Sequence, residues 1–89
     1  MKFQFEPAEQ SCFVTETTCS SSMRCEIPVA PKTLLKGLKH LLLNANERDH
    51  TIGGVMFDRM RDGIRVNVGS FSYTFKYVHL FPVVMETAQ

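Results

Sequence analysis

Residues 53–77 read GGVMFDRMRDGIRVNVGSFSYTFKY, and this stretch decides the fold. It contains two residue pairs, Asp62-Gly63 and Gly69-Ser70, that suit two-residue hairpin loops, because glycine accepts the positive φ that such loops require. The segments on either side of the loops alternate apolar and polar side chains, as half-buried β-strands do. The stretch therefore predicts an antiparallel meander of three strands.

The pairing that these loops impose also sorts the side chains between two faces, because residues opposite each other in an antiparallel ladder point the same way. The predicted apolar face carries Val55, Phe57, Ile64, Val66, Val68, Phe71, Tyr73 and Phe75. The predicted polar face carries Asp58, Arg65, Asn67, Ser72, Thr74 and Lys76, with Met56 and Met60 as apolar exceptions. A three-residue loop at residues 61–63 would instead bury the two methionines and expose Phe57.

The segment before the meander has the period of a helix. Leucines recur three and four positions apart from Leu34 to Leu42, and their stripe covers about 120° of the helix circumference. Pro31 suits a first helical turn, and the asparagines at 44 and 46 suit an exit, so we expect one amphipathic helix over residues 31–46. Gly37 costs about 1 kcal/mol relative to alanine inside a helix, which indicates a close approach between helix and sheet.

The remaining segments complete the predicted fold. We expect a short strand at residues 2–6 and a hairpin formed by residues 11–18 and 23–29. Pro82 should stop regular pairing, and residues 84–89 should form a loose tail. A helix and a sheet with one apolar face each can bury those faces against one another. The predicted class is α+β, with one antiparallel sheet of five or six strands packed on a single amphipathic helix, in the order βββαβββ, as a single domain over residues 1–89.

The composition is that of an ordinary globular protein and excludes few functions. Hydrophobic residues make up 44% of the 89 residues, which argues against intrinsic disorder. The net charge of +1 gives no overall preference for nucleic acid. The longest aliphatic run, residues 41–43, is far shorter than the ~20 residues of a membrane helix, and residues 1–10 do not resemble a signal peptide. We therefore expect a cytoplasmic protein with no membrane contact.

No motif for catalysis, a cofactor or a metal stands out. Cys12, Cys19 and Cys25 have the spacing of neither a redox pair nor a zinc ribbon, so packed thiols are the simpler interpretation, and a disulfide between the first and the third stays open. The histidines at 40, 50 and 79, even together with Asp49 or a cysteine, match no metal-ligand pattern. The sequence predicts a protein that is not an enzyme and has no catalytic residues, cofactor or metal.

The predicted helix offers the first candidate for partner binding. Lys32, Lys36 and Lys39 fall within about 60° of one another, opposite the leucine stripe, and Leu43 falls among them. Such a surface suits phosphate or an acidic protein surface with an apolar notch. The plain alternative is that lysines on the outer face of a helix serve solubility.

The polar face of the meander offers the second candidate, because Met56 and Met60 place flexible apolar groups there beside Arg65. We expect a small protein-binding module that acts sterically as an inhibitor, adaptor or regulator of another protein, with homodimerisation left open. The alternative function is binding of single-stranded nucleic acid by the lysines together with the aromatic side chains of residues 71–77. In that case the aromatics would have to face solvent rather than the core.

Overall fold

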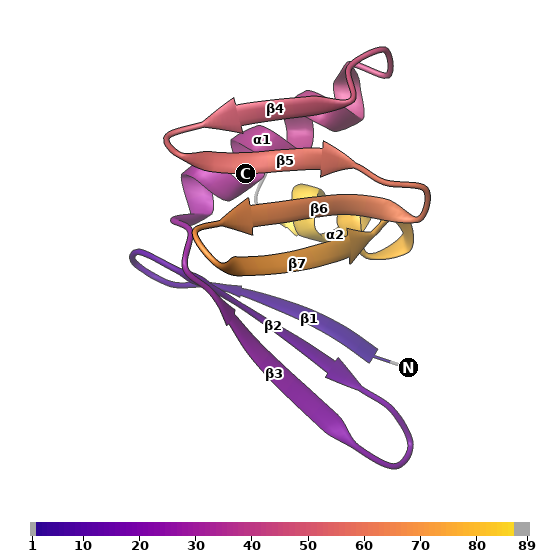
Figure 1. Cartoon of the computed structure of the whole chain (residues 1–89). Helices are drawn as coiled ribbons and strands as arrows, with labels where there is room; N and C mark the ends of the chain where they lie inside the picture. Colours follow the sequence, from indigo (N-terminus) through magenta and orange to yellow (C-terminus); the bar gives the residue numbers. More distant parts are fainter. Residues whose placement is uncertain (1, 87–89) are drawn as a thin grey trace.

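The computed structural model describes residues 2–86, apart from the side chains of residues 81, 82, 85 and 86. This part of the chain forms two antiparallel sheets and two helices (Figure 1). The first sheet contains β1 (Lys2–Pro7), β2 (Cys12–Thr17) and β3 (Ser22–Ile27). The second sheet contains β4 (Asp49–Ile52), β5 (Val55–Arg59), β6 (Gly63–Val68) and β7 (Phe71–Lys76). Helix α1 (Pro31–Leu43) connects the two sheets, and α2 (Tyr77–Glu86) follows β7.

The α+β class and the antiparallel pairing agree with the sequence, but the prediction of a single sheet is wrong. The strand orders are β1-β2-β3 and β4-β5-β6-β7, so the amino-terminal strands pair only among themselves within the described residues. The sequence also predicts neither β4 nor α2. Helix α1 ends at Leu43, and the chain enters β4 six residues later. Residues 84–86 belong to α2 instead of a loose tail, while residues 87–89 lie outside the described part of the chain.

The loop between β6 and β7 is the one that the sequence predicts. Val68 pairs with Phe71, which leaves Gly69 and Ser70 as a two-residue loop. Gly69 has a φ of 58°. Positive φ at the first loop position is favourable only for glycine, and it matches the right-handed twist of the two strands.

Residues 60–62 connect β5 to β6, and the backbone amide of Met60 donates to the carbonyl oxygen of Gly63 at 2.8 Å. The two-residue turn is therefore 61–62, one position earlier than predicted. Gly63 is therefore the first residue of β6, where a Cβ would overlap the backbone carbonyl oxygen of Phe75. This glycine permits the close approach of β7 and is not part of the turn. The pairing shifts by two positions, so that Phe57 lies opposite Val66, and every side chain keeps its predicted face because the shift is even.

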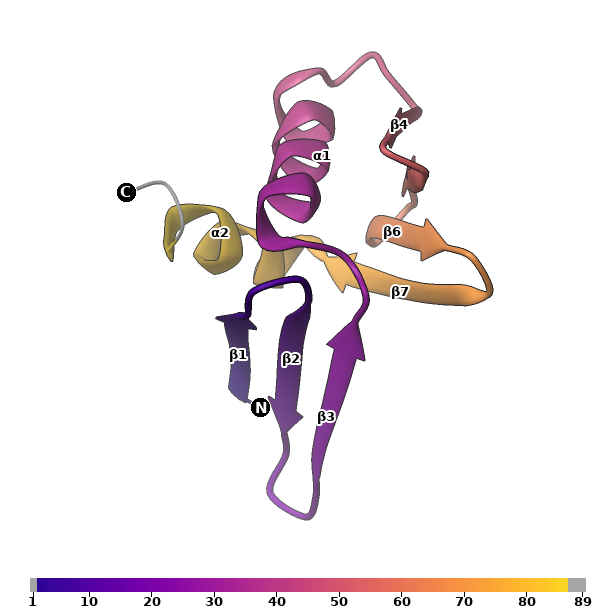
Figure 2. The ribbon, with the colours of Figure 1, turned by 90° about the vertical axis from the view of Figure 1, so that its left-hand side faces the viewer.

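Both sheets and both helices contribute to one hydrophobic core. Its buried side chains are Phe5, Cys12, Val14, Ile27, Val29, Leu34, Leu38, Leu41, Val55, Phe57, Ile64, Val66, Phe75, Leu80 and Val83. Figure 2 shows α1 beside the second sheet and the β2–β3 hairpin projecting away from the helices. A Cβ on Gly37 would run into the ring of Phe57, which confirms the close approach of helix and sheet expected at this glycine.

Helix α2 has the burial pattern of a helix that lies on a core. Leu80 and Val83, three positions apart, are both buried, whereas Val78 is 74% exposed. The start of the helix is fixed against the β5–β6 loop, because the backbone amide of Tyr77 donates to the carbonyl oxygen of Asp62 at 3.1 Å. Neither described helix is long and apolar enough to span a membrane.

Candidate functional site

Helix α1 presents the three predicted lysines together. Lys32, Lys36 and Lys39 border an open hollow of about 390 Å³, whose remaining lining residue is Leu35. We call these four residues the lysine surface. None of the three lysines forms an ion pair with any residue that the structure describes. Leu43 does not line the hollow and stands apart at the last position of α1, where it is 81% exposed.

The other predicted contact residues lie on the outer face of the second sheet. We call Met56, Met60 and Arg65 the methionine face, and its two methionines are exposed, as the predicted faces require. Arg65 is already engaged within the chain, because its guanidinium lies 3.6 Å from the Asp58 carboxylate. That carboxylate also accepts a hydrogen bond of 3.0 Å from the side chain of Asn67.

The lysine surface and the methionine face point in opposite directions. Helix α1 lies beside the second sheet (Figure 2). Its leucines pack on the inner face of that sheet, so its lysines lie on the side away from the sheet, while the methionines lie on the outer face of the same sheet. The two candidate contact regions that the sequence offers are therefore two separate surfaces.

The aromatic side chains of β7 face the core. Phe75 is buried, and Phe71 and Tyr73 pack against the core cluster. The hydroxyl of Tyr73 donates to Glu16 of β2 at 3.4 Å, and this contact links the two sheets. Burial, together with the negative charge of Glu16, raises the pKa of Tyr73 far above its ordinary value. These rings do not form the exposed stacking platform that single-stranded nucleic acid would need.

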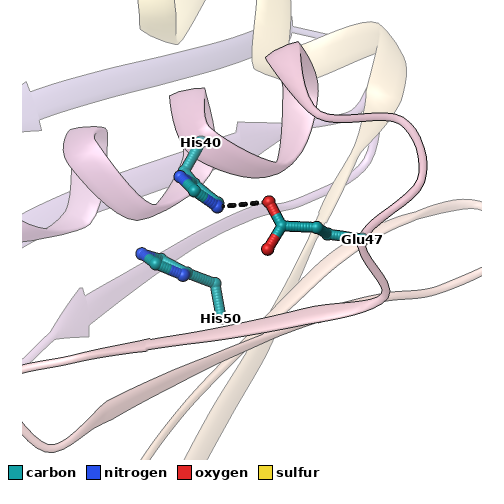
Figure 3. Close-up of side chains that lie close together, drawn as sticks. All are labelled: His40, Glu47 and His50. Atoms are coloured by element: carbon teal, nitrogen blue, oxygen red, sulfur yellow. Dashed lines mark ion pairs between the residues drawn. The ribbon is translucent and has the colours of Figure 1, made fainter.

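A third group of side chains meets where α1 leads into β4 (Figure 3). His40 belongs to α1, Glu47 to the following loop and His50 to β4, and one possible ligand atom from each lies within 4.8 Å of the others. We call these residues the His-Glu-His cluster. The Nε2 atom of His40 lies 2.6 Å from the Glu47 carboxylate. The rings of the two histidines are stacked, with centroids 3.7 Å apart and planes inclined by 13°.

Backbone contacts hold the loop that carries Glu47. The amide and the side chain of Asn44 both donate to the carbonyl oxygen of His40, at 3.0 and 2.7 Å, and so end the helix. The guanidinium of Arg59, from β5, donates to the carbonyl oxygens of Leu41, Asn44 and Glu47. A cation suits this position, because the last carbonyl groups of a helix lack partners and carry partial negative charge. The loop is thereby fixed between the end of α1 and β5.

The sequence brings two members of this cluster into consideration, the histidines, but not the third. From the sequence, Asp49 is the candidate acidic partner, yet Asp49 pairs with Asp58 in the β4–β5 ladder and so belongs to the outer face. His50 is the next residue and points to the opposite face, toward α1. Glu47 becomes a candidate only when β4 is known to turn back along the helix. This short strand is not predicted, because the residues at 44–50 are mostly polar and lack the alternation typical of a strand.

The cysteines are free thiols. Cys12 is buried, and its Sγ donates to the carbonyl oxygen of Val29 at 3.4 Å. Burial raises its pKa to about 11, so the group is a thiol at neutral pH and a poor nucleophile. Cys19 is exposed and Cys25 is half-buried. The packed-thiol interpretation therefore applies best to Cys12.

The described side chains thus offer three candidate sites: the lysine surface, the methionine face and the His-Glu-His cluster. Comparisons of the chain with protein-family models, with curated proteins and with solved structures find no match. The function has to be inferred from the chemistry of these three sites.

Proposed function

We propose that this chain is a small, non-enzymatic protein-binding module whose lysine surface binds an acidic segment of a partner protein. In this function it acts sterically, as an inhibitor, adaptor or regulator, by covering the segment that it binds. The observation that carries the proposal is that three lysines without ion-pair partners among the described residues line one open hollow together with an apolar side chain.

The placement of the charges argues against solubility as their only purpose. Lys32 lies in the first turn of α1, that turn contains no acidic residue, and no side chain caps the helix. The amino terminus of a helix carries partial positive charge, so a glutamate there would stabilise the helix by about 0.3–1 kcal/mol, whereas a lysine is unfavourable. A glutamate would serve solubility equally well. The helix is therefore less stable than it would be with a glutamate in its first turn, but its outer surface carries only positive charge.

The hollow gives this surface a means of selecting its partner. Leu35 packs partly against the core and offers apolar contact area between the lysine stems. Lysine side chains cover apolar groups with their methylene stems while the ammonium groups stay in water. A partner segment with one apolar side chain flanked by carboxylates would match both features, and the carboxylates would also accelerate association.

Nucleic acid is the alternative partner, and the structure favours it less. The lysine surface could bind phosphates without sequence preference. However, the aromatic side chains of β7, which would have to stack on the bases in this alternative, face the core. What remains is a three-lysine surface, and so small a number of phosphate contacts is expected to give weak binding at physiological salt.

A charge-reversal experiment tests the proposal. The tagged chain, the variant Lys36→Glu/Lys39→Glu and the matched control Lys2→Glu/Lys76→Glu are used to capture proteins from a host lysate treated with nuclease. The control reverses two exposed lysines that lie on the sheets. A captured protein is then purified, and its dissociation constant is measured with each variant at two salt concentrations.

We expect the parent and the control to bind the purified partner with similar dissociation constants, and the helix variant to bind at least about tenfold more weakly. The affinity of the parent should decrease as salt increases. Equal binding by both variants would refute the lysine surface as the contact. Binding of a random single-stranded oligonucleotide that is steeply salt-dependent and is lost in the helix variant would favour the nucleic-acid alternative.

A further inference from the structure

The His-Glu-His cluster contains the three side chains in the described part of the chain that are best arranged to hold a metal ion. We propose that His40, Glu47 and His50 bind a divalent transition-metal ion, of which zinc is the best match. This inference does not depend on the proposed function, because the cluster is not part of the hollow that the lysines border.

The donor atoms select the class of metal. Two imidazole nitrogens and one carboxylate oxygen are typical ligands of Zn²⁺, whereas Mg²⁺ and Ca²⁺ prefer oxygen ligands alone. Three protein ligands leave the fourth position of a tetrahedral zinc ion for water or for a side chain of a partner. Cobalt(II) accepts the same ligands and geometry, so it can serve as a spectroscopic probe.

The distances fit the ion after small side-chain movements. Zinc-to-ligand bonds of about 2.0–2.1 Å place the ligand atoms of a tetrahedral site about 3.3 Å apart. The three candidate atoms lie within 4.8 Å of one another, so no pair needs to close by more than about 1.5 Å, and the His40–Glu47 pair, at 2.6 Å, needs to open slightly. The two stacked rings must also rotate so that one nitrogen of each points to a common centre. The backbone need not move, because Arg59 and the β4–β5 ladder already fix the segments that carry Glu47 and His50.

The cluster also holds one polar atom without a hydrogen bond. The Nε2 atom of His40 is shielded from solvent and has no hydrogen-bond partner among the described residues. The Glu47 carboxylate lies beside it at an ion-pair distance of 2.6 Å. A shielded nitrogen without a hydrogen bond is costly, and a metal ion would satisfy this one. An ion could enter, because the side chains of His40 and Glu47 remain 32% and 46% exposed.

An ion pair between His40 and Glu47 is the simplest other explanation. It would involve two of the three side chains and would leave His50 as a stacked neighbour with no polar role. Removal of His50 therefore distinguishes the two explanations. A metal site loses a ligand when His50 becomes glutamine, while a simple ion pair is unaffected.

Titration calorimetry with ZnCl₂ on the full chain, first stripped of metal with a chelator, tests the inference. We expect one zinc ion per chain. His50→Gln and Glu47→Gln should each weaken zinc binding by at least about tenfold, and His40→Gln/His50→Gln should abolish it. The matched controls are His79→Gln, which removes the histidine that packs on Phe3, and Cys19→Ser, which removes the exposed thiol. Both controls should bind zinc as the parent does.

Two further measurements show where the ion binds and whether the variants fold. Cobalt(II) should give the intense visible absorption of a four-coordinate site without the thiolate charge-transfer band that a cysteine ligand would add. Saturating zinc should raise the melting temperature of the parent and both controls but not that of His50→Gln, whose melting temperature in chelator should match the parent. Undiminished zinc binding in His40→Gln/His50→Gln, loss of binding in Cys19→Ser, or no zinc binding by the parent would each overturn the proposal.

Discussion

Gly37 shows how one residue sets the distance between helix α1 and the second sheet. Its missing side chain makes room for the ring of Phe57, which is fully buried directly beneath it. The sequence predicts this role correctly, because a glycine inside an otherwise good helix is unfavourable unless a close contact requires it. It does not identify the ring that fills the space.

Replacing Gly37 with alanine should destabilise the protein, although alanine is the better helix former. Helix propensity alone favours Gly37→Ala by about 1 kcal/mol, but the added methyl group would overlap the Phe57 ring. Overpacking of this kind costs about 1–3 kcal/mol. We expect a lower urea midpoint for this variant and a change of less than about 0.5 kcal/mol for Lys36→Ala on the exposed side of the same helix. A higher midpoint for Gly37→Ala would show that α1 can move away from the sheet.

Among the elements, those with strong periodicity are predictable and the short or mixed ones are not. The leucine stripe locates α1, and alternation locates β5, β6 and β7 together with the face that each side chain occupies. Helix α2 escapes prediction because its sequence, YVHLFPVVME, is rich in aromatic and β-branched residues that favour strands and contains a proline. Burial of Leu80 and Val83 against the core outweighs these local preferences.

Paired truncations in α2 test this assignment. Leu80 is 1% exposed and Val78 is 74% exposed, so one side chain fills the core and the other faces solvent. We expect Leu80→Ala to reduce the free energy of unfolding by about 2–5 kcal/mol and Val78→Ala to change it by less than about 0.5 kcal/mol. The readout is chemical denaturation followed by circular dichroism. Comparable losses for the two variants would contradict the helical arrangement of this segment.

At the scale of the whole molecule, the sequence predicts which faces are apolar but not which strands pair. Phe5, Val14 and Ile27 form an apolar face on the first sheet, and the second sheet also has an apolar face. A single continuous sheet would bury the same side chains as two sheets around a shared core, so the apolar pattern does not distinguish the two architectures. Alternation identifies the buried face of each strand separately. It does not show which strands pair when they are distant in the sequence. For the same reason the His-Glu-His cluster could not be predicted, since it depends on β4 returning beside α1.

The shared core makes the folded protein sensitive to alkali. Cys12 of the first sheet and Tyr73 of the second both have pKa values raised mainly by burial, to about 11 for Cys12 and higher for Tyr73. In the unfolded chain these groups lose their protons at lower pH, near their ordinary pKa values of 9.0 and 10.0. The unfolded state therefore binds fewer protons than the folded state above about pH 9, and stability must decrease as pH rises through this range.

We expect the urea midpoint to be insensitive to these two groups below about pH 8 and to decline between about pH 9 and 10.5 because of them. The double variant Cys12→Ala/Tyr73→Phe should start from a lower midpoint, since it loses packing and the hydrogen bond to Glu16, but should decline less over the same interval. Cys19→Ser is the matched control, because an exposed thiol meets water in both states, and it should decline as the parent does. An unchanged slope in the double variant would mean that the junction between the two sheets is open to water, contrary to the complete burial of Cys12.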